Sequence, residues 1–248
     1  MSAALHVEAL ADRVVVTLDR PEVRNAIDQQ MVDELHAVCA ELESDPRVLL
    51  LIGSGGVFAA GADISQLRDR GHAEALRGIN SRVFDRVRRL PMPVIGLIDG
   101  FALGGGAELA YACDLRIGTS RVKIGNPEPG LGILAAAGST WRLAELVGEP
   151  VAKQILLAGR ILDADEALAL HLLSEVVDPD GLLTAGHRLA DVICKQAPLA
   201  IRLTKAVFHA PREAHPFVDD LAQAVLFETT DKRERMTAFL EKKERART

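Results

Sequence analysis

Residues 100–110 read GFALGGGAELA, and this stretch decides how the chain is expected to fold. The apolar run Val94–Ile98 before it is typical of a buried strand, and Ala107–Cys113 after it has the composition of a helix. Gly104–Gly106 therefore stand at a strand-to-helix junction. At such a junction the free N–H groups of the first helical turn and the helix dipole both favour an oxygen atom that carries negative charge.

Two kinds of ligand fit that junction: a phosphate, or a carbonyl oxygen that gains negative charge during a reaction. Dinucleotide sites need GxGxxG after the first strand, and P-loops need GxxxxGK[ST]. Neither pattern occurs from Gly100 onward, which disfavours nucleotide binding. An oxyanion hole needs a second N–H donor from another loop, and the small residues Gly61–Asp63 can supply one.

Upstream of the junction, strand-like and helix-like segments alternate. Val14–Leu18 and Val48–Ile52 are β-branched or aliphatic runs that predict buried strands. Asp28 stands where a helix N-cap is expected. Two apolar stripes at helical spacing predict amphipathic helices, and their members are Met31, Leu35, Val38 and Leu42, then Leu76, Ile79, Val83, Val87 and Leu90.

Downstream of the junction, Leu115–Gly118 and Val122–Ile124 are predicted strands, and the pattern beyond about Gly138 is wholly helical. The expected helices are Trp141–Val147, Val151–Ala158, Asp165–Leu170, Leu182–Gln196, Leu199–Phe208, Phe217–Thr229 and Arg233–Lys243. We therefore expect an α/β core over residues 1–195 and a helical C-terminal region over residues 196–248.

Two glutamates could carry proton chemistry. Glu108 lies in the first turn of the helix that the glycines open, where a carboxylate also has a purely stabilising role with the helix dipole. Glu128 lies in the turn NPEPG at residues 126–130, a composition that is more often a solvated loop than a site. Two carboxylates around one water would nevertheless form an acid/base pair, because repulsion and burial raise the pKa of one of them.

Composition excludes several classes of function. The chain carries 29 Lys and Arg against 35 Asp and Glu, a net charge of −6, so nucleic-acid binding is not expected. No uncharged apolar run reaches the roughly 18 to 20 residues that cross a bilayer. The three cysteines Cys39, Cys113 and Cys194 form no CxxC pair, and the seven histidines have no metal-ligand spacing. We predict free thiols, no metal, no membrane association and a cytoplasmic location.

Several ordered motifs together resemble the enoyl-CoA hydratase/isomerase family, also called the crotonase superfamily. The motifs are NAI at residues 25–27, FAAGADI at 58–64, GFALGGGAELA at 100–110, CD at 113–114 and PE at 127–128. The resemblance covers nearly the whole chain. It implies a spiral of ββα units with a helical C-terminal trimerisation region, and substrates that are acyl thioesters of coenzyme A.

The resemblance also implies roles for individual residues. The backbone N–H groups of Ala62 and Gly105 would hold the thioester oxygen, and Glu108 and Glu128 would act on the water. The residues implied in binding coenzyme A and substrate are Arg24, Ala60, Ala62, Asp63, Ile64, Ser65 and Gly105. Coenzyme A arrives with the substrate, so no separate cofactor is expected, and the implied assembly is a homotrimer or a dimer of trimers.

The implied reaction is hydration of a 2-enoyl-CoA to a 3-hydroxyacyl-CoA. Residues 133–142 read ILAAAGSTWR, whereas family hydratases usually have a stretch like IPGAGGTQRL here. This difference favours an isomerase or another enolate-type reaction as the alternative. A non-catalytic acyl-CoA-binding protein is the alternative from a different class, and retention of both glutamates argues against it, because binding needs only the N–H donors.

Overall fold

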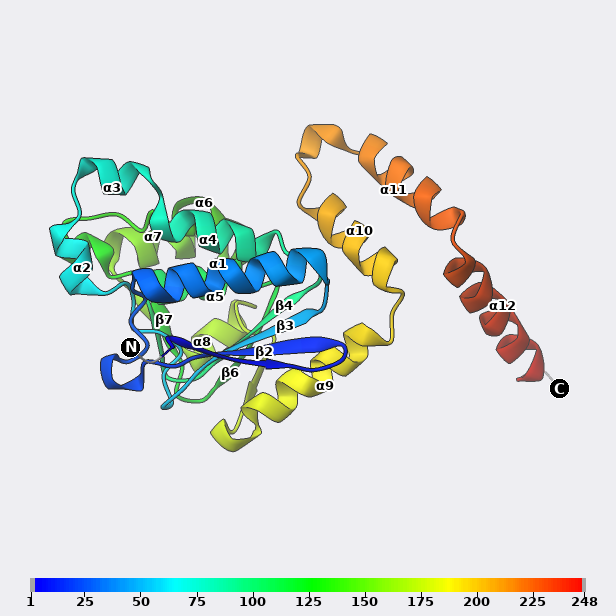
Figure 1. The fold of residues 1–248 in the computed structure, drawn as a ribbon, viewed down its shortest axis with the longest axis horizontal. Helices are drawn as coiled ribbons and strands as arrows, with labels where there is room; N and C mark the ends of the chain where they lie inside the picture. Colours follow the sequence, from blue (N-terminus) through cyan, green and yellow to red (C-terminus); the bar gives the residue numbers. More distant parts are fainter. Residues whose placement is uncertain (1–2, 247–248) are drawn as a thin grey trace. The chain divides into compact units, whose positions relative to one another are not determined.

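The computed structural model describes residues 3–246 and is drawn in Figure 1. The chain divides into two compact units between Asp191 and Val192, inside helix α9 (Leu182–Cys194). The first contains both β-sheets, and the second is helical.

The first unit is built on two sheets. The strands are β1 Leu5–Ala9, β2 Arg13–Leu18, β3 Val48–Gly53, β4 Val94–Ile98, β5 Phe101–Leu103, β6 Leu115–Thr119, β7 Lys123–Gly125, β8 Ile161–Asp163 and β9 Glu175–Val177. The larger sheet has the order β1-β2-β3-β4-β6-β9, parallel throughout except for the antiparallel β1 edge. The smaller sheet has the order β5-β7-β8, in which β5 and β7 are parallel.

Each successive turn of the chain adds one strand to the larger sheet and then one strand to the smaller sheet. β4 joins the larger sheet, and after only two residues β5 joins the smaller one and leads into α5. β6 and β7 repeat this step, and isolated bridges from Ala59 to Ala102 and from Ile27 to Ala62 continue the smaller sheet backwards along the chain. The result is a spiral of ββα units, which confirms the fold expected from the resemblance.

Most helices of the first unit match segments that the sequence predicts to be helical, but α2 was not predicted and one predicted stripe is divided between two helices. They are α1 Gln29–Ser44, α2 Ile64–Asp69, α3 His72–Leu76, α4 Ile79–Arg88, α5 Gly105–Ala112, α6 Ser139–Val147, α7 Glu149–Ala158, α8 Ala164–Ala169 and α9 Leu182–Cys194. Asp28 caps α1 by accepting a hydrogen bond from Met31 N, as predicted. The predicted stripe from Leu76 to Leu90 is confirmed on α4, where Val83 and Val87 are buried, and is wrong at Leu76: Gly78, with φ of 60°, separates α3 from α4 and leaves Leu76 72% exposed.

The expectation of a wholly helical pattern beyond Gly138 is also wrong. β8 and β9 are strands of three residues each, and each adds an edge to one of the sheets. Three residues are too few to show an alternating pattern in the sequence. Their extended form comes from pairing with β7 and β6.

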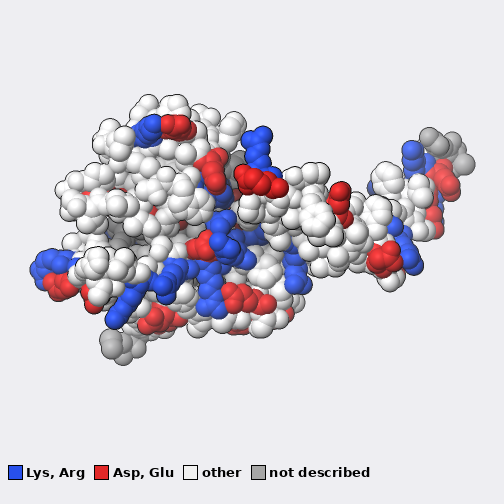
Figure 2. All heavy atoms as spheres, turned by 90° about the horizontal axis from the view of Figure 1, so that it is seen from above, with Lys and Arg blue, Asp and Glu red and all other residues white. Residues whose placement is uncertain are grey.

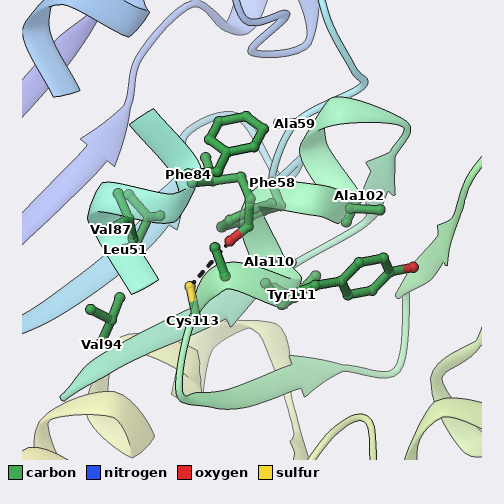
Figure 3. Close-up of a cluster of buried hydrophobic side chains, with 14 of the residues drawn as sticks. Leu51, Phe58, Ala59, Phe84, Val87, Val94, Ala102, Ala110, Tyr111 and Cys113 are labelled. Atoms are coloured by element: carbon green, nitrogen blue, oxygen red, sulfur yellow. Dashed lines mark hydrogen bonds between the residues drawn. The ribbon is translucent and has the colours of Figure 1, made fainter. Parts of the chain in front are cut away.

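The hydrophobic core lies on both faces of the larger sheet. All five residues of β4 are buried, because parallel strands at the centre of a sheet are covered on both sides. Helix α1 lies along one face and α9 along the other, where Gly186 leaves room for Leu97 of β4 (Figure 1). Figure 3 shows the part of the core around Phe58, Phe84 and Cys113, and Cys113 donates a hydrogen bond to the carbonyl of Leu109.

The second unit consists mainly of helices α10 Pro198–Phe208, α11 Phe217–Phe227 and α12 Thr230–Arg245. Over residues 192–246 no residue is buried, and several large apolar side chains are exposed. They include Phe208, Phe217, Leu221, Val225, Phe227, Phe239 and Leu240. Helices with such faces are usually stabilised by packing against another surface.

Cys39 and Cys113 are buried and belong to no disulfide, as predicted, and Cys194 belongs to no disulfide but is only partly buried. Within residues 3–246, none of the helices has the length and apolar character needed to span a bilayer. Acidic and basic side chains are interleaved on the face shown in Figure 2.

Candidate active site

The start of α5 is shaped by two glycines, Gly104 and Gly106, at positions that do not accommodate a side chain. Gly104 has φ of 53° and ψ of −125°, a backbone conformation that residues with a Cβ rarely adopt. A Cβ on Gly106 would lie 2.1 Å from the carbonyl oxygen of Ala59, so the helix packs backbone to backbone against the loop before Ala62. The strand-to-helix junction predicted from the sequence is therefore confirmed, and its position is fixed by this close contact.

Two backbone N–H groups lie close to each other beside that junction. A Cβ on Gly105 would lie 3.4 Å from the nitrogen of Ala62. Among the described residues, neither the Ala62 N–H nor the Gly105 N–H has an acceptor. Gly105 is the first residue of α5, where the helix leaves its N–H groups unbonded.

The unbonded state of the Ala62 N–H follows from the smaller sheet. In the parallel bridge between Ile27 and Ala62, Ile27 N donates to Gly61 O at 2.8 Å and Ile27 O accepts from Asp63 N at 2.9 Å. The bridge therefore uses the residues on either side of Ala62 and leaves the N–H of Ala62 itself directed away from Ile27. The structure thus brings together the two predicted N–H donors, which are 43 positions apart in the sequence.

Glu108 is buried, with 5% of its surface exposed. Its Oε1 atom accepts hydrogen bonds from Ala137 N at 2.7 Å and Ser139 N at 3.2 Å. Burial raises the pKa of Glu108 to about 7, the nearby charge of Glu128 adds to the rise, and the two backbone bonds oppose it. A carboxyl group with this pKa can exchange a proton near neutral pH.

Glu128 begins a short 3-10 helix, Glu128–Leu131, and is 7% exposed, so the alternative of a solvated loop is wrong for its side chain. Its Oε1 atom accepts a 3.4 Å hydrogen bond from Asn126 Nδ2. Its Oε2 atom is buried and has no hydrogen-bond partner within residues 3–246. Burial raises the pKa of Glu128 as well. A buried carboxylate oxygen without a partner is costly, and it is suited to a ligand or water.

A chain of hydrogen bonds connects the two carboxyl groups. Ser139 donates through its backbone N to Glu108 and through Oγ to Asn126 Oδ1 at 3.2 Å. Asn126 Nδ2 in turn donates to Glu128 and to the carbonyl of Gly104 at 3.5 Å. The side chains of Asn126 and Ser139 are completely buried. No local sequence pattern indicates this link, because Asn126 and Ser139 are 13 positions apart and meet only in the folded chain.

A cavity of about 320 Å³ adjoins Glu108. Helix α4, helix α5 and residues 136–142 line it. On its wall the guanidinium of Arg88 lies 5.1 Å from the centre of the Trp141 ring and pairs with Asp85 at 3.0 Å. The departure from the family's usual stretch at residues 133–142 therefore lies directly at this cavity and beside the carboxyl group of Glu108.

Tyr111 follows Glu108 by one helical turn and also lines the cavity. Its ring points away from the aliphatic cluster in Figure 3. The phenolic hydroxyl is buried and has no hydrogen-bond partner among the residues that the structure describes. Burial and the charges of Glu108 and Glu128 raise the Tyr111 pKa, so the hydroxyl stays neutral over the ordinary pH range.

The residues implied in coenzyme A binding lie around the loop that carries Ala62. Arg24, with φ of 53°, accepts through its carbonyl a hydrogen bond from Ala60 N at 3.0 Å. Asp63 caps α2 by accepting from Ser65 N at 3.1 Å. The hydrogen bond from the Ser65 hydroxyl, followed by the bonds from the backbone N–H groups of Gln66 and Ser65, lowers the pKa of Asp63. Ile64 and Ser65 are exposed on the first turn of α2. The structure thus places all five residues beside one another and shows a capping role for Asp63.

Asn25, the first residue of the NAI motif, anchors this loop. It has φ of 55°, its Oδ1 accepts from Arg20 N at 2.9 Å, and its Nδ2 donates to the carbonyls of Ser54 at 3.0 Å and Val57 at 2.7 Å. Asparagine tolerates this left-handed conformation better than most residues. Asn25 therefore joins the chain after β2 to the chain after β3, where the FAAGADI segment begins.

The chain belongs to the enoyl-CoA hydratase/isomerase family, whose sequence profile matches residues 11–246. It is similar to the short-chain-enoyl-CoA hydratase of Clostridium acetobutylicum, at 38% identity over 92% of this chain and 91% of that protein. It is 39% identical to the crotonyl-CoA hydratase of Syntrophomonas wolfei, over 92% of each chain. The crystal structure of an enoyl-CoA hydratase from Bacillus anthracis matches with a TM-score of 0.91 at 30% identity, over 96% of each chain.

Proposed function

We propose that this chain is an enoyl-CoA hydratase, which adds water across the 2,3 double bond of a 2-enoyl-CoA to give a 3-hydroxyacyl-CoA. The observation that carries the proposal is the pair of buried carboxyl groups, Glu108 and Glu128, joined through Asn126 and Ser139. Burial raises the pKa of Glu108 to about 7 and raises the pKa of Glu128 as well, and a raised pKa suits a carboxyl group to both giving and taking a proton.

The proposed mechanism begins with the thioester carbonyl between the N–H groups of Ala62 and Gly105. Their hydrogen bonds draw electrons from the double bond, which makes C3 electrophilic and stabilises the enolate. Ionised Glu108 takes a proton from water as the water oxygen bonds to C3. Protonated Glu128 then gives its proton to C2, and the two carboxyl groups again hold one proton between them.

The similar proteins support the same reaction class. Relatives at 38% and 39% identity are named for hydration of short-chain enoyl-CoA and crotonyl-CoA. The cavity of about 320 Å³ beside Glu108 offers room for a short acyl group. We therefore propose a short 2-enoyl-CoA as the substrate class.

An isomerase or another enolate-type reaction is the second candidate, favoured by residues 133–142. This stretch holds Glu108 through Ala137 N and Ser139 N, so a changed stretch changes where the carboxyl group stands relative to the substrate. An isomerase moves a proton between C4 and C2 and adds no water. A non-catalytic binder would gain nothing from two buried carboxyl groups, whose burial costs stability.

One set of assays separates the three candidates. A hydratase lowers the enoyl absorbance of crotonyl-CoA, and an isomerase raises the enoyl absorbance when supplied with a 3-enoyl-CoA. A binder does neither but still releases heat on titration with butyryl-CoA. Crotonyl-CoA that stays unchanged while a 3-enoyl-CoA is converted would replace our proposal with the isomerase.

We further propose that Arg24, Ala60, Asp63, Ile64 and Ser65 line the path of coenzyme A, and that residues 196–248 form a region for assembly into a homotrimer or a dimer of trimers. The absence of any buried residue over 192–246 supports the assembly, because these helices need another surface to pack against. Light scattering after size exclusion tests it, and a monomeric mass at micromolar concentration would contradict it.

A further inference from the structure

Asn80 brings a third polar group to the place where the two N–H donors converge. It is the second residue of α4, which begins after the left-handed Gly78. Its Nδ2 atom lies 3.5 Å from the position that a Cβ on Gly105 would occupy, and the nitrogen of Ala62 lies 3.4 Å from that same position. Donors from three separate elements, the Ala62 loop, α5 and α4, therefore surround one point.

The amide of Asn80 is not used by the protein. Its Oδ1 atom is buried and has no partner, and no hydrogen bond from Nδ2 is found within residues 3–246. Leaving a buried amide oxygen unsatisfied costs about 1–3 kcal/mol. The other two asparagines of the chain, Asn25 and Asn126, each make hydrogen bonds through both side-chain atoms.

The local backbone does not require asparagine at this position. Asn80 has an ordinary helical conformation and is not among the residues with positive φ. Its side chain does not cap α4, because Gly78 is the N-cap and no side-chain capping bond is formed there. Asparagine is also a weaker helix former than leucine or alanine. Capping, a left-handed backbone and helix propensity therefore all fail to explain the residue.

On the basis of the proposed function, we infer that Asn80 Nδ2 donates a third hydrogen bond to the thioester carbonyl oxygen held by Ala62 and Gly105. The bond strengthens as negative charge develops on that oxygen, so Asn80 acts on the enolate-like state more than on bound substrate. Donors fixed on rigid elements contribute most, and Asn80 stands on a helix that packs against α1 and α5.

Turnover is the first test. Asn80→Leu keeps the approximate volume and removes the donor, and it is expected to lower kcat by about 10- to 100-fold with a smaller change in KM. Gln154→Leu makes the same kind of change on the exposed side of α7 and is the matched control, expected to leave kcat unchanged. Asn80→Ala repeats the test with a smaller side chain should the leucine variant fail to fold.

Asn80→Asp tests whether Asn80 acts as a hydrogen-bond donor or only fills space. It has the same shape, but its carboxylate cannot donate and repels the developing negative charge. Its loss of kcat is expected to exceed that of Asn80→Leu at pH 8 and to shrink at lower pH relative to the wild type, as the carboxyl group is protonated. A residue that only fills space would tolerate aspartate at both pH values.

The infrared spectrum of bound butyryl-CoA labelled with ¹³C at the thioester carbonyl provides a test that does not depend on turnover. A hydrogen bond to the carbonyl lowers its stretching frequency, so the band is expected at higher frequency in Asn80→Leu than in the wild type. If the wild type does not hydrate crotonyl-CoA but the band still differs between the wild type and Asn80→Leu, the proposed reaction is wrong and the role of Asn80 stands. An unchanged band together with an unchanged kcat overturns the role of Asn80.

Discussion

A Cβ added to Gly105 would lie 3.4 Å from the backbone nitrogen of Ala62. The first residue of α5 and the loop after β3 are therefore close neighbours. Both N–H groups are without an acceptor among the described residues. Because Gly105 and Ala62 are so close, the space beside Gly105 is the centre of the proposed site.

Gly105→Ala is expected to fold and to lose turnover, because the added methyl group narrows the space beside Gly105 and Ala62 and crowds the thioester oxygen. We expect kcat to fall by about 10²-fold, as misplacement by about 1 Å can cost that much. Gly105→Pro removes the N–H itself and should lose about 10²- to 10³-fold. Gly181→Ala is the control, since its methyl group would meet nothing within 4 Å. Full turnover by both Gly105 variants, folded by circular dichroism, would exclude the oxyanion hole.

Glu128→Gln is expected to remove most hydratase activity, by about 10²- to 10⁴-fold, while butyryl-CoA still binds. The reason is that glutamine keeps the shape but cannot transfer a proton. Turnover and calorimetric titration measure the two effects separately. Glu8→Gln, on the exposed face of β1, is the control for loss of one negative charge. Hydration at the wild-type rate in Glu128→Gln would exclude the two-glutamate mechanism.

Glu108→Gln is expected to change how stability depends on pH. The folded pKa of about 7 lies above the unfolded value of 4.5, so the native state binds the proton more tightly. The stabilisation is complete below pH 4.5 and is lost as pH rises through 7. Glutamine avoids burying a charge, so at pH 8 the variant should unfold with a free energy higher by on the order of 2 kcal/mol.

Denaturant unfolding at pH 5 and pH 8 measures this difference. The gain of Glu108→Gln over the wild type should be small at pH 5 and large at pH 8. The same gain at both pH values would mean that the carboxyl group does not titrate between them.

Asn25→Ala is expected to lower the free energy of unfolding by about 2 kcal/mol or more, because it leaves the carbonyls of Ser54 and Val57 without their donor. Asn25→Asp keeps the acceptor for Arg20 N and the tolerance of positive φ, but it loses both donors. Urea unfolding should therefore rank wild type above both variants. Wild-type unfolding midpoints in both would show that the loop is held by other contacts.

The sequence alone determined the main elements and the candidate catalytic residues of this protein. The strands at Val14–Leu18 and Val94–Ile98 and the cap at Asp28 were readable because apolar runs, helical spacing and capping chemistry act over a few neighbouring residues. The glycines before Glu108 indicated an anion-stabilising junction for the same reason. The ordered family motifs gave roles to Ala62 and Glu128, which were already candidates, and implied the spiral fold.

Only the tertiary structure decided how these pieces meet. The spiral brings Ala62 to Gly105 and places Asn80 beside both, and these contacts join residues from three separate elements. The link from Glu108 through Ser139 and Asn126 to Glu128 also depends on folding. Burial, which raises the pKa of both glutamates, is a property of the packed chain, since desolvation requires neighbours that local sequence does not specify.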